Sequence, residues 1–231
     1  MAAFTVVEMV SRDETTRRVG APVNPVLLGV AIAAAVAAVL VALWVLGNPV
    51  NSEDITVERD VQLTNWGPLA YTFPFFSWIG DFKGAILEVI IFIAVLIFNI
   101  RSWVVAIGGV LSGAWYELAV NLVHRARPTT ALVPHVTEHP GASSFPSGHT
   151  IFIITVTTVL MLCFGNRFLP RWALPIGWIL VVLIVAANGI SRIYTGAHWP
   201  SDVLGAVFIA VAWLTLLLSV RWVSDRVRPQ T

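Results

Sequence analysis

Six long apolar segments constrain the fold of this chain more than any other feature of its sequence. Each has about the 17–25 residues that the hydrocarbon core of a bilayer requires. In lipid, such a segment must be helical, because every backbone polar group needs a partner within the segment. The segments cover residues 25–46, 84–100, 102–123, 147–164, 172–190 and 200–220.

The composition agrees with a polytopic membrane protein. Hydrophobic residues make up 57% of the 231 residues and charged residues 12%, against about 25% charged residues in soluble domains. Cys163 is the single cysteine, so no disulfide framework exists. A net charge of +1 argues against a nucleic-acid partner. We predict an all-α fold, a single membrane domain over residues 1–231, with a six-helix bundle at 25–222 and tails at 1–24 and 223–231.

The arginines predict the orientation of the bundle. Six spans place both termini on one side of the membrane, and basic residues are enriched in cytoplasmic segments. Nine of the fourteen basic residues fall on the side of the termini, which predicts cytoplasmic termini in a cell membrane. These nine are Arg12, Arg17, Arg18, Arg101, Arg167, Arg171, Arg221, Arg226 and Arg228, and the other five are Arg59, Lys83, Arg125, Arg127 and Arg192.

The longest connection on the predicted outer side, residues 47–83, has two halves. The first, "NSEDITVERDVQ", is acidic, and we expect it to be solvated. The second, "NWGPLAYTFPFFSWIGDF", is rich in aromatic residues. It fits an aromatic belt at the membrane interface, and also a surface-lying or re-entrant segment that guides a lipid toward a site.

Three polar clusters converge on the outer face in this topology. They are "HRARP" at 124–128, "SSFPSGHT" at 143–150 and "SRIYTGAHWPSD" at 191–202. Each alone has a structural explanation, such as interfacial arginines, an N-cap at Ser147, or an acid in the first turn of a helix at Asp202. Together they leave His149 and His198 without a structural reason.

The residue types in these clusters suit phosphate chemistry. A helix N-terminus offers free N–H groups to an anion, and Gly148 lets the anion approach the backbone closely. Arginine supplies paired donors that match phosphate oxygens. Histidine exchanges protons or acts as a nucleophile near neutral pH. Asp202 could fix the tautomer of His198 by accepting a hydrogen bond from the ring nitrogen that carries the proton.

These residues resemble the type-2 phosphatidic-acid phosphatase superfamily, whose pattern is K-x6-R-P, then P-S-G-H, then S-R-x5-H-x3-D. The second motif is complete at 146–149 and the third at Ser191, Arg192, His198 and Asp202. The first motif is half present as Arg127 and Pro128. The region of resemblance runs from about residue 120 to residue 202.

The resemblance implies a role for each matching residue. His198 would attack phosphorus, Asp202 would orient His198, and His149 would protonate the leaving group and then help to activate water. The phosphate would be held by Arg127, Arg192, Ser147 and Gly148. The reaction would need no metal and no other cofactor, because guanidinium and amide groups can stabilise the charge of phosphoryl transfer.

The chain departs from the family pattern at one position. The motif lysine should stand seven residues before Arg127, where this chain has Val120. Arg125 is a candidate for an extra phosphate ligand. His124 would share a helical face with Val120 and Arg127, and Glu117 would lie one turn below, where it could contact the motif residues. Acids inside spans, here Glu88 and Glu117, are functional candidates, although both could be solvated near the interface.

Two further features leave alternatives open. His135 and His139 flank Glu138, but three residues with this spacing do not form a known zinc site, and we expect no metal. The partner we predict is a lipid phosphate in the bilayer, such as a prenyl diphosphate, phosphatidylglycerol phosphate or phosphatidate, without an obligate protein partner. We therefore predict a membrane lipid phosphatase that hydrolyses a phosphomonoester or diphosphate of such a lipid through a phosphohistidine. The competing interpretations are a non-catalytic lipid-phosphate binding or transport protein of the same fold and a lipid phosphotransferase.

Overall fold

The computed structural model describes residues 22–229 except 81, 139–140 and 142, with the side chains of 80, 82 and 83 also outside the description. Most of the predicted N-terminal tail, including Arg12, Arg17 and Arg18, therefore lies outside the described residues. The same holds for His139 of the possible zinc cluster and for the side chain of Lys83.

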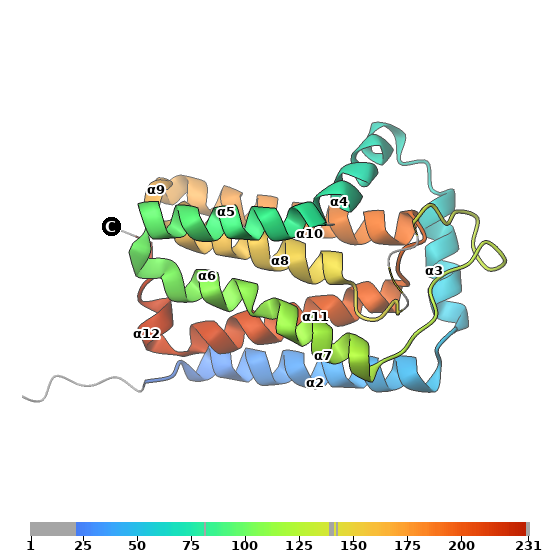
Figure 1. Ribbon diagram of the computed structural model, residues 1–231, viewed down its shortest axis with the longest axis horizontal. Helices are drawn as coiled ribbons and strands as arrows, with labels where there is room; N and C mark the ends of the chain where they lie inside the picture. Colours follow the sequence, from blue (N-terminus) through green and yellow to red (C-terminus); the bar gives the residue numbers. More distant parts are fainter. Residues whose placement is uncertain (1–21, 81, 139–140, 142, 230–231) are drawn as a thin grey trace, which may run out of the picture.

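The described chain is all-helical, and its long helices run side by side along the longest axis of the molecule (Figure 1). They are α2 (Pro25–Gly47), α5 (Phe82–Phe98), α6 (Trp103–Val110) followed by α7 (Ser112–Leu122), α8 (Gly148–Leu160), α10 (Leu174–Tyr194) and α11 (Pro200–Ser219). This arrangement confirms the predicted helical class.

Five helical segments of the described chain are long and apolar enough to cross a membrane. They are Pro25–Gly47, Ile100–Leu122, Gly148–Phe168, Arg171–Tyr194 and Pro200–Ser219. The remaining predicted span corresponds to α5, whose apolar part is the shorter Gly84–Phe98. At about 1.5 Å per residue, α5 is somewhat shorter than a hydrocarbon core of about 30 Å. Six spans therefore remain a prediction.

Small side chains let the helices approach closely. On α2 the buried residues include Ala31, Ala34 and Ala38, and this helix packs against α11. Small residues at helix contacts are typical of membrane bundles, where close packing replaces the hydrophobic effect between helices. Of the candidate spans, the one that contains α8 is the most enclosed. The bundle is thus built around α8 and α11.

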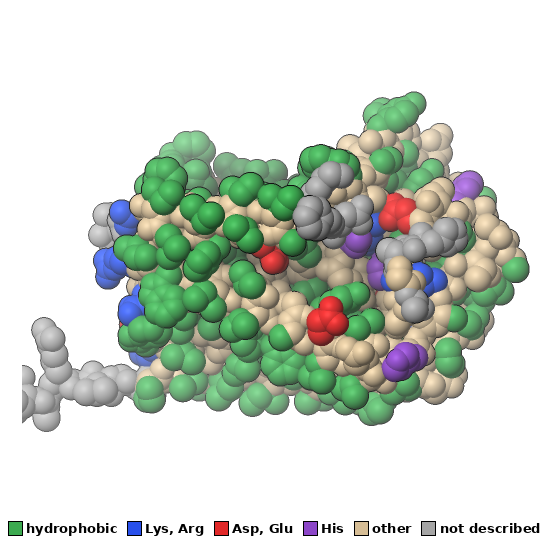
Figure 2. Space-filling model, viewed as in Figure 1, with side chains coloured by type: hydrophobic (Ala, Val, Ile, Leu, Met, Phe, Trp, Pro, Cys, Tyr) green, Lys and Arg blue, Asp and Glu red, His purple; other side chains and the backbone are tan. Residues whose placement is uncertain are grey.

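One end of the bundle carries short helices and arginines. There lie η2 (Ile100–Ser102), the π-helical turn η3 (Met161–Gly165), α9 (Asn166–Phe168), η4 (Arg171–Ala173) and α12 (Arg221–Ser224) (Figure 1). The backbone N–H of Arg221 donates to the carbonyl of Pro22 at 2.9 Å, so both ends of the described chain meet here. Lys and Arg side chains gather at this end in Figure 2. Which side of the membrane it faces stays a prediction.

Helix α3 (Ser52–Leu63) crosses the opposite end of the bundle (Figure 1). This segment is the acidic one that we expected to be solvated, and that expectation was wrong for one face of the helix. Its buried residues are Asp54, Glu58 and Gln62, which follow each other at four-residue intervals and so share one helical face. The Gln62 amide donates to the carbonyls of His135 at 2.9 Å and Ile193 at 3.2 Å. The acidic segment is therefore a helix whose polar face packs on the bundle.

The aromatic half of this connection forms η1 (Gly67–Thr72) and α4 (Phe73–Gly80). Phe73 and Phe76 are buried, whereas Tyr71, Phe75 and Trp78 are exposed. Helix α4 packs against α8 and α10. The segment thus lies on the bundle surface, with some aromatic rings packed inward and others exposed. This arrangement agrees both with an aromatic belt at the membrane interface and with a surface-lying segment that guides a lipid.

We predict that Glu58 makes the stability of the protein depend on pH. Burial, with the nearby negative charges of Asp202 and Asp54, raises the pKa of Glu58 from 4.5 to about 9. Between these values the folded state keeps a proton that the unfolded state releases, so the free energy of unfolding falls as pH rises. The Glu58→Gln variant should unfold at a higher temperature than wild type at pH 8, and this difference should shrink toward pH 5.

Thermal unfolding in detergent across this pH range measures the effect. Glu53→Gln is the matched control, because Glu53 is exposed on the same helix, and it should follow wild type. A Glu58→Gln melting temperature that changes with pH as wild type does would contradict the assignment of a protonated Glu58.

Candidate active site

The three polar clusters meet at the end of the bundle where α3 lies. A cavity of ≈ 410 Å³ opens between α5, α7 and α8, and the residues that line it include Arg127, Gly148, His149 and His198. Its walls also include Tyr116 and the apolar Ile151 and Phe152, and Glu88 lies on the α5 side. The structure therefore brings together two predicted histidines and a predicted arginine in one cavity with a mixed polar and apolar lining.

His198 lies in the turn between α10 and α11, and its imidazole is oriented by a backbone carbonyl. Its Nδ1 is 2.7 Å from the carbonyl oxygen of Ser144. A carbonyl only accepts hydrogen bonds, so Nδ1 carries the proton and Nε2 keeps its lone pair. Nε2 is 3.5 Å from the Arg127 guanidinium. Nε2 of His198 is thus free of a proton and adjacent to a cation.

Burial sets the charge of this imidazole. The pKa of His198 is lowered below 6.5, because desolvation disfavours the imidazolium and the neighbouring Arg127 adds to this effect. Asp202 and the Ser144 carbonyl oppose the shift without reversing it. His198 is therefore neutral at neutral pH, which is the state in which an imidazole acts as a nucleophile.

Arg127 is held in place by backbone carbonyls. It donates from Nε to Gly141 at 3.0 Å, and from its two terminal nitrogens to Ala197 at 2.5 Å and Ser143 at 2.6 Å. These carbonyls come from the loop before α8 and from the turn before His198. The guanidinium therefore links two of the predicted clusters and has a fixed orientation at the cavity.

The N-terminus of α8 forms another wall of the site. Ser147 is its N-cap, and the Ser147 hydroxyl accepts from the backbone N–H of Thr150 at 3.4 Å. A Cβ on Gly148 would lie 3.0 Å from a ring carbon of Tyr116. A larger residue would thus crowd the contact between α7 and the first turn of α8. His149 lines the cavity, with Nε2 3.3 Å from the carbonyl oxygen of Ser77.

Asp202 does not contact His198 as directly as expected. Its Oδ2 is 3.9 Å from His198 Nδ1 and accepts instead from the backbone N–H of Trp199 at 2.9 Å. Its Oδ1 accepts from the guanidinium of Arg125 at 2.5 Å. The carbonyl of Ser144, rather than Asp202, is the hydrogen-bond partner of Nδ1, and Asp202 acts at longer range on the charge of the ring.

Arg192 is enclosed and bonded to side chains of other segments. Its guanidinium donates to Glu138 at 2.8 Å and also to the hydroxyls of Ser77 and Ser191. The Ser77 hydroxyl in turn donates to Glu138. The Arg192 side chain is 0% exposed and does not belong to the cavity lining described here. A carboxylate, Glu138, and two hydroxyls therefore accept from the terminal nitrogens that the resemblance assigns to phosphate.

The residues expected to replace the motif lysine take other positions. Helix α7 ends at Leu122, so His124 and Arg127 do not continue the helical face of Val120, and that expectation was wrong. His124 and Glu117 are exposed, and within the described part of the chain no side-chain hydrogen bond or ion pair joins them to the motif residues. Arg125 is buried and bonded to Asp202, outside the cavity.

Sequence reasoning missed Tyr116, Ser144 and Asp54. Tyr116 lies one helical turn before Val120, on the face that carries the expected lysine, so helical spacing could have identified it. The spacing of Asp54, Glu58 and Gln62 was an equally readable signal of a one-sided helix. Ser144 contributes its carbonyl to His198, and no sequence pattern marks a backbone contact of this kind.

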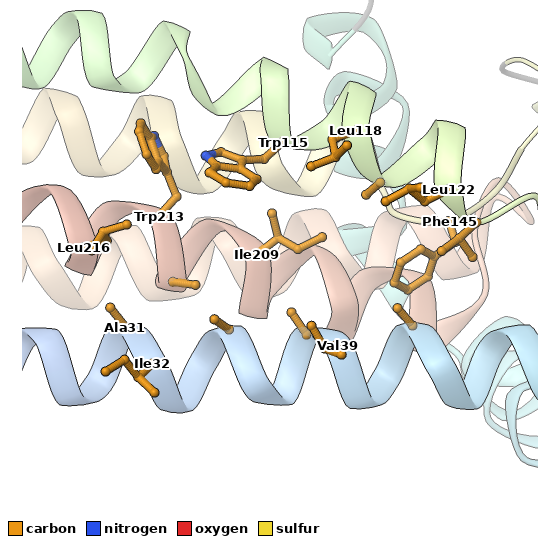
Figure 3. Close-up of a pocket in the computed structure, with 16 residues that line it drawn as sticks. Ala31, Ile32, Val39, Trp115, Leu118, Leu122, Phe145, Ile209, Trp213 and Leu216 are labelled. Carbon is orange, nitrogen blue, oxygen red and sulfur yellow. The ribbon is translucent and has the colours of Figure 1, made fainter.

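A second cavity, of ≈ 360 Å³, lies on the other side of α7, between α2, α7 and α11 (Figure 3). Trp115 and Leu118 of α7 and Ile209 and Trp213 of α11 point into it, with Phe145 at one end (Figure 3). None of its lining residues is ionisable. It therefore suits hydrocarbon and has no group for acid–base or nucleophilic chemistry.

Two curated relatives resemble the region that contains the clusters. Undecaprenyl-diphosphatase BcrC of Bacillus subtilis is 33% identical over 103 residues, which cover 44% of this chain and 48% of the relative. Phosphatidylglycerophosphatase B of Haemophilus influenzae is 37% identical over 107 residues, covering 42% of this chain and 40% of the relative. In both cases the matched part of the chain spans less than half of the relative's length.

The fold has a counterpart among solved structures. The crystal structure of a transmembrane PAP2 type phosphatidylglycerolphosphate phosphatase from Bacillus subtilis superposes with a TM-score of 0.69, at 20% identity, over 87% of this chain and 98% of that chain. The PAP2 superfamily itself matches residues 101–227, more than half of the sequence and the part that holds all three clusters. By this match the chain belongs to the PAP2 superfamily.

Proposed function

We propose that this protein is a membrane lipid phosphatase that hydrolyses a phosphomonoester or diphosphate through a phosphohistidine on His198. The observation that carries the proposal is the position of His198 Nε2, unprotonated and 3.5 Å from the Arg127 guanidinium at a cavity. A nucleophile beside a cation suits attack on an anionic phosphorus, because the cation balances the charge of the equatorial oxygens.

In the first step, the lone pair of Nε2 attacks phosphorus and the bond from phosphorus to the leaving oxygen breaks. The proton on Nδ1 stays with His198 and its hydrogen bond to Ser144 strengthens as the ring becomes positive. His149 lines the same cavity and protonates the leaving alkoxide or phosphate. In the second step His149 removes a proton from water, which attacks phosphorus and releases inorganic phosphate from His198.

The protein's own donors would hold the phosphate. Arg127 and the first turn of α8 at Gly148 border the cavity, and a helix N-terminus binds anions through its free N–H groups. Arg192 would reach the phosphate after exchanging Glu138 for a phosphate oxygen, since both ligands are oxyanions that match a guanidinium. We propose that these groups make a metal ion unnecessary.

The cavity favours a lipid over a soluble ester. Ile151 and Phe152 give it an apolar wall next to the polar end, and α8 is part of a candidate span. A substrate with a phosphate head and a hydrocarbon tail satisfies both surfaces. The names of the relatives include prenyl-diphosphate and phosphatidylglycerophosphate phosphatases, so these two lipid classes are the first candidates, with phosphatidate beside them.

We further propose six spans, with both termini in the cytoplasm and the active site at the outer face of a cell membrane, in one domain. The separation of arginines toward the end opposite the site supports this orientation. A phosphotransferase that moves phosphate from His198 to another acceptor would use the same cavity. A non-catalytic binder would have no use for an unprotonated His198 Nε2 beside Arg127.

The function is tested by phosphate release from a panel of lipids. Purified protein in detergent should release inorganic phosphate from at least one of undecaprenyl diphosphate, phosphatidylglycerol phosphate and phosphatidate, and EDTA should not abolish the release. The His198→Ala variant should lose activity by at least about 10³-fold, because no nucleophile remains. Silence of the wild-type protein on the whole panel, or full activity of His198→Ala, would refute the proposal.

A second measurement separates hydrolysis from transfer. With labelled substrate and a rapid acid-free quench, the wild-type protein should carry a labelled phosphoryl group that is stable in alkali and labile in acid, as expected for phosphohistidine. Release of that label to added alcohols in preference to water would instead support a phosphotransferase.

We predict that the hydroxyl of Tyr116 contributes to phosphate binding. Tyr116 lines the cavity and its ring contacts the first turn of α8. Tyr116→Phe keeps this ring contact and removes one hydrogen-bond donor to the phosphate. The transition state should lose about 1 kcal/mol of stabilisation, so kcat/KM should fall roughly fivefold. Tyr71→Phe is the matched control, because Tyr71 is 87% exposed. Equal kcat/KM values for the two variants would exclude a role for the Tyr116 hydroxyl.

A further inference from the structure

Arg125 is the centre of a buried polar network behind the catalytic turn. Its side chain is 0% exposed, and each guanidinium nitrogen has a partner. Nε donates to the carbonyl of Pro49 at 2.8 Å. One terminal nitrogen donates to Ser201 at 2.8 Å and to Asp202 at 2.5 Å, and the other donates to Asp54 at 2.6 Å. A guanidinium so enclosed has one orientation.

Asp54 of α3 ties this network to the start of α11. Its Oδ1 accepts from the backbone N–H of Ser201 at 2.9 Å, and its Oδ2 accepts from the Ser201 hydroxyl at 2.5 Å. Ser201 is the second residue of α11, where a helix has free N–H groups and the positive end of its dipole. Burial alone would raise the pKa of Asp54, but the hydrogen bonds from Ser201, Arg125 and Asn51 outweigh it and lower the pKa. Asp54 is therefore an anion at neutral pH.

The Ser144 carbonyl and the Asp202 carboxylate both act on His198 Nδ1, and Arg125 is hydrogen-bonded to both residues. The side chain of Arg125 binds the carboxylate of Asp202, which lies 3.9 Å from Nδ1. The backbone carbonyl of Arg125 accepts from the N–H of Ser144 at 2.9 Å, and the carbonyl of Ser144 accepts from Nδ1. One residue thus positions both the carbonyl that orients the imidazole and the carboxylate that acts on the charge of the ring.

We propose that Asp54 and Arg125 are positioning residues for His198, and that α3 completes the active site by locking the turn between α10 and α11. The inference rests on the proposed function, in which His198 is the nucleophile. Without Asp54, Arg125 would keep its bonds to Pro49, Ser201 and Asp202, but its second terminal nitrogen would lose its partner on α3. Asp54 holds the guanidinium from the opposite side and at the same time holds the first turn of α11.

The charges of the network explain why a second acid is needed. Asp202 and Asp54 surround one guanidinium, and the N-terminus of α11 offers the additional positive end. Without Asp54, the Arg125 guanidinium would lose its bond to α3 and would pair more fully with Asp202, which would weaken the effect of Asp202 on His198. Glu58 adds no charge at neutral pH, because its pKa is raised to about 9.

The test compares Asp54→Asn with Asp60→Asn. Asparagine keeps the shape of Asp54 and removes its charge, whereas Asp60 is exposed on the same helix. For Asp54→Asn, kcat should fall by roughly 10- to 100-fold, the range expected when a catalytic group is misplaced by a fraction of an ångström to 1 Å. KM should change by less than about threefold, because Arg127 and the α8 N-terminus keep their places. Asp60→Asn should retain the wild-type kcat and KM.

A second measurement does not depend on catalysis. With ¹⁵N-labelled histidine, the ring-nitrogen signals of His198 are identified by their loss in His198→Gln. In the wild-type protein they should report a proton on Nδ1 alone, and in Asp54→Asn they should shift toward a mixture of tautomers. If the wild-type protein releases no phosphate from any lipid, the proposed function fails, and these spectra still decide whether Asp54 orients His198.

Several outcomes would overturn the inference. One is a wild-type kcat together with wild-type His198 signals in Asp54→Asn. Another is a fall in melting temperature and activity with unchanged His198 signals, which would indicate a role in stability only. If Asp54→Asn does not fold, Ser201→Ala tests the same contact more gently. It removes the hydroxyl between Asp54 and Arg125, and kcat should fall by roughly 3- to 10-fold with the same change in the His198 signals.

Discussion

The guanidinium of Arg125 is removed from water and bonded on every side, and the geometry of the site end depends on it. A buried cation is tolerated only when anions and carbonyls replace its hydration. Here those partners come from α3, from the connection after α2 and from the start of α11. The requirement to satisfy one charge therefore joins segments that lie far apart in the sequence. The same residue holds the carbonyl and the carboxylate that act on His198.

The distribution of polar groups along the bundle follows from the cost of placing them in hydrocarbon. Lys and Arg side chains gather at one end, and the histidines lie toward the other end beside a smaller group of basic side chains (Figure 2). An apolar cluster of α5, α6 and α8 fills the interior and extends to η3 and to Val223 of α12 at the arginine end. The two cavities divide in the same way. The cavity on the α5 and α8 side of α7 reaches the histidines, and the cavity on the α2 and α11 side is lined by apolar residues.

Arg192 and Glu138 form an ion pair at the site end of the bundle. For Arg192 to bind phosphate as proposed, one of its terminal nitrogens must exchange Glu138 for a phosphate oxygen. Arg127 needs no such exchange, because carbonyls fix it while it still borders the cavity. The two arginines that the motifs treat alike thus have different surroundings: Arg127 borders the cavity, and Arg192 is bonded to Glu138.

The helical class, the apolar spans and the gathering of three clusters at one end could be predicted from the sequence, because hydrophobic length and period depend on local residues alone. So could the identities of His149, His198 and Arg127 as candidates. Only the tertiary structure decided their partners. The carbonyl of Ser144 on His198, Asp54 on Arg125 and Tyr116 beside Gly148 are contacts between distant segments, which no local pattern specifies. The prediction that the acidic segment before residue 63 is solvated was wrong for the same reason. Its sequence shows that it is polar, but contacts with other helices decide whether its polar side chains are solvated or buried.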